Sequence, residues 1–177
     1  PLEAIKHNYE YIVIELSSFQ LFYLNNINLY IGIILNIYED HLDWHKSFEE
    51  YTNSKKRIKS FVKSENKFFG TLNPGSTTSD LYSEIKNSSQ FYSNTIDLFM
   101  EVTEELKLDY KSAKEFLINS SNKEHRFELC FVHNGVTYIN DSKSTNFNSL
   151  SMATKKVKNA ILIMHGLTKN ITSKDLD

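Results

Sequence analysis

The stretch YIGIILNIYEDHLDWH, residues 30–45, joins an unbroken apolar run to a polar, acidic segment. The run Tyr30–Leu35 is apolar on both faces, which is typical of a strand buried in a parallel sheet that helices cover. An earlier run, Tyr11–Leu16 (YIVIEL), has the same character and predicts another buried strand. The two runs predict an α/β fold with a mostly parallel sheet flanked by helices.

Helices are expected on both sides of these strands. Ser17 and Ser18 can cap a helix over Phe19–Leu24, and the sequence S-F-E-E can form a capping box at the start of a helix over Ser47–Val62. Apolar periodicity predicts further helices at Asp80–Lys86, Asn94–Lys107, Ser112–Ile118 and Asn148–Lys156. Short strands are expected at Lys67–Phe69, Gln90–Tyr92 and Ala160–Met164, with a turn at Asn73–Gly75.

The polar stretch Ser120–Lys123 is the expected linker between two domains, residues 1–122 and residues 123–177. Beyond it, the runs Phe127–Val132 and Val136–Ile139 flank an Asn-Gly pair, which is a strong hairpin signal. Strand–helix–strand order then returns. A second α/β unit is therefore expected to begin after the linker.

Composition excludes several classes of protein. The net charge of −2 gives no electrostatic footprint for nucleic acid, and the single cysteine excludes an intrachain disulfide and a cysteine metal cluster. The sequence contains no run of 18 apolar residues, so no membrane span is predicted and a cytoplasmic protein is expected. Among the 20 basic residues only Arg57 and Arg126 are arginines, which suggests that their planar forks are used.

Glu15 ends the first predicted strand, and His41 follows the second. Because ligands bind beyond the carboxyl ends of strands in an open parallel sheet, these two side chains are expected to converge. A carboxylate oxygen and an imidazole nitrogen suit a divalent cation such as Mg²⁺ or Mn²⁺. The alternative is a capped acidic loop with a surface histidine.

Lys55 lies within the apolar stripe of the helix predicted over Ser47–Val62. Its neighbours on the stripe, spaced alternately by three and four residues, are Phe48, Tyr51, Ile58 and Val62. Desolvation lowers the pKa of a lysine, and a neutral amine can react with CO₂ to form a metal-binding carbamate. In the alternative, the lysine stem packs on the stripe while the ammonium reaches water.

Arg126 opens the predicted hairpin, and Asp141 follows it. The two antiparallel strands bring these residues to the same end, where a guanidinium fork beside a carboxylate and hydroxyls could hold a ribose or a phosphate. A structural ion pair between Arg126 and Asp141 is the alternative.

Five blocks of sequence resemble the Mur ligases in their order and approximate spacing: ELSSFQL (Glu15–Leu21), LNIYEDHLDWH (Leu35–His45), SKKRI (Ser54–Ile58), HRFE (His125–Glu128) and NGVTYINDSKSTN (Asn134–Asn146). The first and last blocks are most similar to the members that add D-glutamate. The pattern N-x-x-x-D-H-x-D is shared more widely, including with folylpolyglutamate synthases. The resemblance covers residues 11–169.

The resemblance implies an ATP-dependent amide-bond ligase of peptidoglycan precursor synthesis. Its substrates would be UDP-N-acetylmuramoyl-L-alanine, D-glutamate and ATP, and the products would include ADP and phosphate. Residues 1–122 would be the later part of a central ATPase domain of the phosphate-loop type, and residues 123–177 the start of a Rossmann-like C-terminal domain. The implied enzyme is a monomer, and the piece is expected to be inactive alone.

The resemblance also implies roles for single residues. Metal ions, Mg²⁺ or Mn²⁺, would be held by Glu15, His41 and a carbamylated Lys55. Nucleotide would be contacted by Asn94, Arg126 and Asp141. The incoming amino acid or the acyl phosphate would lie near Lys143, Thr145 and Lys169. Ser17 matches a position close to the muramoyl substrate, and the residues expected to act in catalysis are His41, Lys55 and Lys143.

The chain departs from the family pattern in several places. No G-x-x-x-x-G-K-[ST] phosphate loop occurs, and the stretch Phe61–Gln90 is shorter than usual. Phe91 replaces a polar residue, and Met164–Thr168 replaces a glycine-rich turn. Two rival hypotheses are another family member, such as the L-alanine-adding or folate-polyglutamating enzyme, and a non-catalytic nucleotide-binding module. A phosphate loop roughly 50 residues before Glu15 would favour the enzyme.

Overall fold

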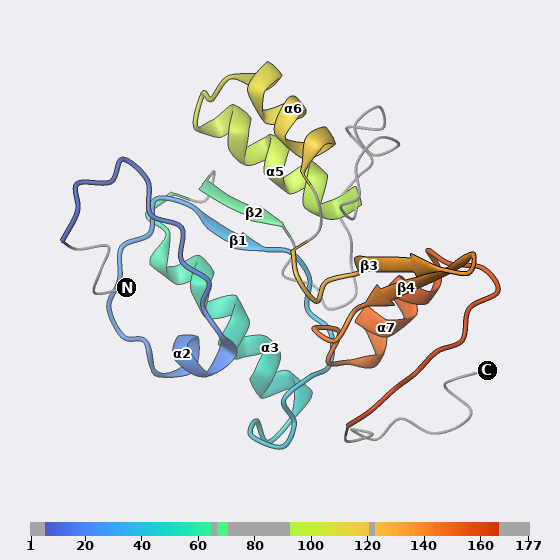
Figure 1. Cartoon of the computed structure of the whole chain (residues 1–177). Helices are drawn as coiled ribbons and strands as arrows, with labels where there is room; N and C mark the ends of the chain where they lie inside the picture. The colour runs from blue at the N-terminus through green and yellow to red at the C-terminus, as the bar shows by residue number, and fades with distance from the viewer. Residues whose placement is uncertain (1–5, 65–66, 71–92, 121–122, 167–177) are drawn as a thin grey trace. The chain divides into compact units, whose positions relative to one another are not determined.

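The computed structural model describes residues 6–64, 67–70, 93–120 and 123–166 (Figure 1). The chain divides into two compact units, residues 1–78 and 79–177, and each is described by itself. The turn predicted at Asn73–Gly75, the helix predicted at Asp80–Lys86 and the strand predicted at Gln90–Tyr92 lie outside the described residues. The expected domains 1–122 and 123–177 stay a prediction.

The first unit is built on a parallel pair of strands. β1 (Gly32–Ile34) pairs with β2 (Phe68–Gly70), and Ile33 lies opposite Phe69. Figure 1 shows the two strands side by side. The core beside them consists of Ile34, Ile37 and Tyr51, with Phe48, Ile58 and Phe68 packed against it. The predicted α/β fold, with parallel strands and helices, is confirmed.

Two capped helices follow the predicted pattern. α2 (Ser18–Tyr23) begins with a complete capping box between Ser17 and Gln20. α3 (Phe48–Lys56) is capped by Ser47, whose hydroxyl accepts from the backbone N–H of Glu50. The Glu50 carboxylate accepts from the N–H of Lys46 rather than from that of Ser47, so only half of the predicted box forms. The helix predicted up to Val62 tightens into a 3₁₀ helix, η1 (Arg57–Phe61).

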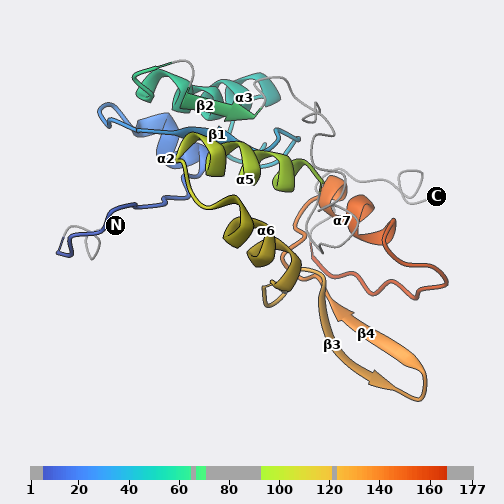
Figure 2. The same ribbon diagram turned by 90° about the horizontal axis from the view of Figure 1, so that it is seen from above.

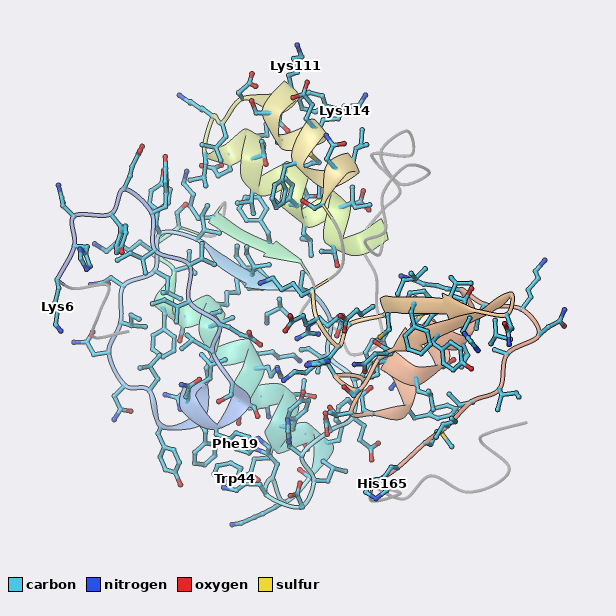
Figure 3. The ribbon with its side chains drawn as sticks, in the orientation of Figure 1. Lys6, Phe19, Trp44, Lys111, Lys114 and His165 are labelled. Atoms are coloured by element: carbon cyan, nitrogen blue, oxygen red, sulfur yellow. The ribbon has the colours of Figure 1, made fainter. Side chains whose placement is uncertain are left out.

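Aromatic rings pack α2 against the loop that precedes α3. The rings of Phe19 and Trp44 meet edge to face with centroids 5.0 Å apart, and Figure 3 shows the two side chains together. Phe22 also meets Trp44 edge to face, at 5.2 Å. These contacts attach α2 to a segment more than twenty residues further along the chain.

The strand predicted over Tyr11–Leu16 is wrong. Residues 11–17 form neither helix nor strand, and Val13 is 97% exposed. A β-branched apolar run becomes a strand only when a neighbouring strand takes up its backbone N–H and C=O groups. No strand of the described residues pairs with this segment.

The second unit contains a helical pair. α5 (Ser93–Glu105) and α6 (Tyr110–Asn119) pack around a core of Ile96, Met100, Ala113 and Leu117. Asp109 caps α6 by accepting from the N–H of Ser112 at 2.7 Å. Both helices confirm the sequence prediction.

The predicted hairpin is also present. β3 (Glu128–His133) pairs with β4 (Val136–Asn140) in antiparallel fashion, and Figure 2 shows the two strands joined at their tip by a tight turn. Asn134 and Gly135 both have positive φ, 49° and 76°, as a two-residue hairpin turn requires. The helix expected next is α7 (Phe147–Thr154).

The strand predicted at Ala160–Met164 is wrong as well. These residues carry no strand pairing, and Ile161 and Ile163 are 93% and 91% exposed. As with residues 11–17, no described strand lies alongside to complete the backbone pairing.

Within the described ranges, no helix has the length and apolar character that a bilayer crossing requires.

Candidate functional site

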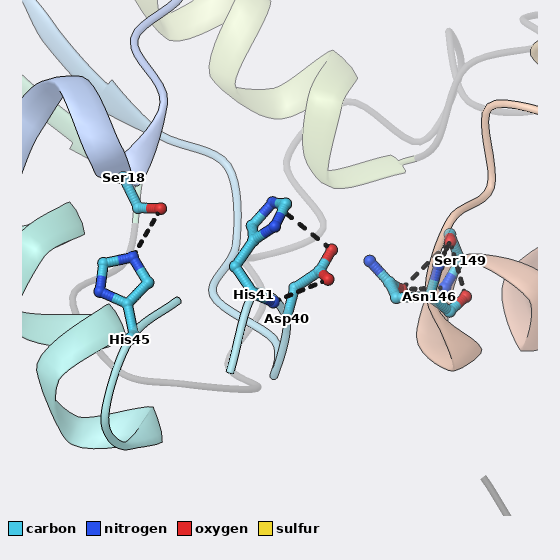
Figure 4. Close-up of polar contacts among 6 residues, drawn as sticks. All are labelled: Ser18, Asp40, His41, His45, Asn146 and Ser149. Atoms are coloured by element: carbon cyan, nitrogen blue, oxygen red, sulfur yellow. Dashed lines mark hydrogen bonds and ion pairs between the residues drawn. The ribbon is translucent and has the colours of Figure 1, made fainter. Parts of the chain in front are cut away.

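The loop after β1 presents Asp40 and His41 (Figure 4). One carboxylate oxygen of Asp40 accepts from the backbone N–H of His41 at 2.9 Å, and the other lies 3.9 Å from Nε2 of the same histidine. His41 has a φ of 57°, which is uncommon for a residue with a side chain. Such backbone conformations are found preferentially at functional sites.

Tyr51 lies between the two strongest candidates of the first unit. Its ring is buried, with its centroid 6.2 Å from that of His41. The Lys55 ammonium lies 5.4 Å from the same ring centroid. His41, from the loop, and Lys55, from α3, therefore contact a common aromatic side chain.

The half-buried Lys55 amine has a perturbed pKa. Burial lowers its pKa below the ordinary value, and the charges of Asp40 and Glu15 oppose that shift. The net lowering shows that desolvation outweighs the two carboxylates. A lysine in this environment holds a larger neutral fraction than one in open solvent.

Asp40 is a residue to which the sequence assigned no role. Burial raises the pKa of Tyr51 to about 12, and the Asp40 charge adds to that effect. The same carboxylate is the stronger of the two attractions on the Lys55 ammonium. Its position directly before His41 in the acidic segment was the signal that could have identified it.

Glu15 and Ser17 lie on the chain that leads into α2. Glu15 is exposed, but its charge reaches Lys55, whereas Ser17 is half-buried and caps the helix. Over the described part of the chain, no three side chains among His, Cys, Asp and Glu are grouped closely enough to hold a metal ion. The predicted ligand set of Glu15, His41 and modified Lys55 therefore stays a prediction.

In the second unit, Asp141 is held by its own surroundings. Its carboxylate accepts from the backbone N–H of Phe127 at 2.8 Å and from the Ser144 hydroxyl at 2.5 Å. Among the described residues no ion pair joins it to Arg126, which is exposed. Both neighbours of Arg126 along the chain, His125 and Phe127, have positive φ, 65° and 51°. The guanidinium is thus displayed from a strained turn.

The remaining predicted residues are dispersed. Lys143 and Thr145 are exposed in the turn after β4, and the backbone N–H of Lys143 donates to the carbonyl of His125 at 3.0 Å. Asn94 lies in the first turn of α5. Lys169 lies outside the described residues.

A sequence model of the Mur ligase middle domain matches residues 2–164. The chain belongs to the Mur ligase family. The matched range extends to both sides of Ser120–Lys123, so it neither supports nor excludes a domain boundary at this predicted linker.

Three relatives of this Mur ligase chain are each named UDP-N-acetylmuramoylalanine–D-glutamate ligase. The protein of Fusobacterium nucleatum is 33% identical over 92% of this chain and 45% of its own length. Those of Francisella tularensis subsp. novicida and Thermosipho melanesiensis are 30% and 32% identical over 95% and 90% of this chain, and 45% and 41% of their own. The chain thus spans less than half the length of these relatives.

Proposed function

We propose that this Mur ligase chain is part of an ATP-dependent ligase that joins D-glutamate to UDP-N-acetylmuramoyl-L-alanine, giving ADP and phosphate. The observation that carries the proposal is the agreement of relatives bearing that name, at 30–33% identity over at least 90% of the chain. An enzyme that uses ATP and a UDP-linked precursor is expected in the cytoplasm, and we expect it to act as a monomer.

The proposed reaction has two steps. The terminal carboxylate of the muramoyl-alanine attacks the γ-phosphate of ATP, forming an acyl phosphate and releasing ADP. The amine of D-glutamate then attacks the acyl carbon, and phosphate leaves. Because a carboxylate must approach a polyphosphate, positive charge placed beside both is the main physical requirement.

The proposed donors to a divalent cation lie in the first unit. The charges of Glu15 and Asp40 act on Lys55, and His41 has an imidazole ring beside that of Tyr51, so carboxylate oxygens and an imidazole nitrogen are the groups that would bind the ion. A carbamate on Lys55 would replace a cation by a further pair of oxygens, and the lowered pKa of Lys55 favours the neutral amine that reacts with CO₂. Bound Mg²⁺ or Mn²⁺ would offset the charge of the phosphates.

The second unit would supply the groups that meet the nucleotide and the acceptor. The Arg126 fork is exposed and not bound to Asp141, so it can hold a phosphate or ribose. Contacts to the nucleotide are proposed for Asn94, Arg126 and Asp141. Contacts to D-glutamate and the acyl phosphate are proposed for Lys143, Thr145 and Lys169. Contacts to the muramoyl group are proposed for Ser17, which belongs to the first unit. Closure of the domains would exclude water from the acyl phosphate.

The decisive experiment replaces Lys55 in the full-length ligase. Lys55→Ala is expected to abolish ligation, and added bicarbonate is not expected to restore it, because the amine that forms the carbamate is gone. Lys63→Ala is the matched control, since Lys63 is an exposed lysine just beyond η1. Phosphate release is measured in three separate assays of the unmodified ligase. The first two contain the UDP-linked precursor with D-glutamate or with L-alanine, and the third contains a folate with L-glutamate. If Lys55→Ala keeps most of the wild-type activity, the carbamate role is refuted. If the ligase prefers L-alanine, or the folate with L-glutamate, over D-glutamate, the D-glutamate assignment is refuted.

A further inference from the structure

We propose that α2 is clamped at both ends, by a hydrogen bond between Ser18 and His45 and by the guanidinium of Arg57. The clamp sets where Glu15 and Ser17 stand relative to the loop and helix that carry His41 and Lys55. His45 and Arg57 are then positioning residues of the ligase, an inference that rests on the proposed function.

α2 cannot hold its own position. It is six residues long, and isolated helices shorter than about 12 residues are marginal in water. The chain leading into it, residues 11–17, has no strand pairing to fix it. The placement of the helix must therefore come from contacts with the rest of the first unit.

The first end of the clamp is buried. The Ser18 hydroxyl oxygen and Nε2 of His45 lie 2.9 Å apart, and the two residues are 2% and 1% exposed (Figure 4). The ring of Phe19 stacks on that of His45, with centroids 5.7 Å apart and an angle of 11° between the planes. A hydrogen bond in such dry surroundings is stronger than one in water.

This serine and histidine do not form a nucleophilic pair. Nucleophilic catalysis requires an accessible hydroxyl and a base oriented by a third group. Ser18 is closed off from solvent, and Nδ1 of His45 has no hydrogen-bond partner in the described part of the chain. The ring of His45 therefore acts as a structural tie, through the Nε2 atom that lies against the Ser18 hydroxyl.

The second end of the clamp uses both arms of an arginine. Nη1 of Arg57 donates to the carbonyl of Phe22, and Nη2 donates to that of Leu24 at 2.6 Å. Carbonyls at the end of a helix lack partners within it, and a planar fork satisfies two of them at once. A lysine at position 57 would bring the charge without the geometry. The retained arginine in this lysine-rich chain therefore has a defined use.

Each tie is attached to a segment that carries a proposed metal-site residue. The backbone N–H of His45 donates to the carbonyl of His41 at 3.0 Å, so these two residues belong to the same turn of the loop. Arg57 follows α3 directly and is two residues from Lys55. If either tie breaks, α2 can shift, and Glu15 moves with it. A displacement of about 1 Å in such a site can lower the rate roughly 100-fold.

A double-mutant cycle in the full-length ligase tests the first tie. Ser18→Ala removes one partner, and His45→Phe keeps a ring against Phe19 while removing the other. We expect each single variant to lower kcat/KM roughly tenfold. The double variant should be no worse than either, because the same bond is lost in all three. Effects that multiply would overturn the proposal.

Arg57→Lys tests the second tie. It should lower kcat/KM as much as Arg57→Ala does, while Lys63→Ala leaves it unchanged. Activities are measured well below the unfolding temperature of each variant, so a loss of stability alone leaves kcat and KM at wild-type values. That outcome, in Arg57→Lys or in the Ser18 and His45 variants, would overturn the positioning role.

Hydrogen exchange separates this inference from the proposed function. The amides of Leu21 and Leu24, which donate to Ser17 and Gln20, should exchange faster in every clamp variant and not in Lys63→Ala. This hydrogen-exchange measurement does not require the ligase to be active. An inactive wild-type ligase would refute the proposed function, whereas unchanged exchange in α2 would refute the clamp.

Discussion

Gly70→Ala is the substitution whose effect on stability can be worked out most directly. Gly70 ends β2 opposite Ile34 of β1, with a φ of +97°. A Cβ added there would stand 1.8 Å from the carbonyl oxygen of Ile34 and 2.8 Å from its carbon. The obstacle is backbone of the paired strand, so no side-chain rotation can relieve it.

The magnitude has two parts. Holding a non-glycine residue in a left-handed conformation costs about 1–2 kcal/mol. Moving the Ile34 carbonyl aside opens the end of the β1–β2 pair, and a buried group left without a partner costs about 1–3 kcal/mol. Because Ile34 is only 6% exposed, water does not readily replace the lost contact. We expect the free energy of unfolding of the first unit to fall by roughly 3 kcal/mol.

Urea unfolding followed by fluorescence measures this loss, because Trp44 is the single tryptophan and packs within the same unit. Gly32→Ala is the matched control in β1. Its Cβ would meet Cγ2 of Val62 at 2.6 Å, which is a side-chain obstacle. Adding Val62→Ala should reduce the cost of Gly32→Ala to less than about 1 kcal/mol. A Gly70→Ala chain within about 1 kcal/mol of wild type, at an unchanged urea slope, would refute the reasoning.

Two further predictions concern charge. Arg126→Lys should weaken ATP binding by the full-length ligase although the positive charge is kept, because the two-armed guanidinium is lost. Isothermal titration calorimetry measures the Kd for ATP, and an unchanged Kd would contradict the prediction. Lys55→Met should stabilise the fold at neutral pH. The pKa of Lys55 is lowered by burial, so the charged amine is disfavoured in the folded state, and this penalty is full below the folded pKa and shrinks as pH rises through it towards 10.5. The gain in unfolding free energy should therefore fade at high pH, and a gain independent of pH would show that packing causes it.

The sequence predicted local features of the site well. The surroundings of Lys55 followed from helical periodicity, because a residue in the middle of an apolar stripe must lose water when the stripe packs. The cap at Ser17 and the Asn134–Gly135 turn followed from backbone chemistry that involves only near neighbours. The roles of the predicted site residues stay predictions.

Contacts between distant segments could not be predicted in this way. The predicted convergence of Glu15 and His41 rested on a strand over Tyr11–Leu16, but that segment is unpaired, and Glu15 reaches Lys55 through its charge instead. The acidic segment placed Asp40 beside His41, but local periodicity could not show that the Asp40 charge acts on Tyr51 and Lys55, which lie on α3.

The amino-acid sequence by itself determined where helices start and where the hairpin turns, and it placed Lys55 within an apolar stripe, since these features depend on residues within one or two turns of each other. Only the tertiary structure decided which apolar runs became strands, because a strand exists through the hydrogen bonds of its neighbour. Only the structure likewise joined Ser18 to His45 and Arg57 to the end of α2, across 27 to 35 residues of chain. Such pairings are chosen by packing in three dimensions, on which local periodicity carries no information.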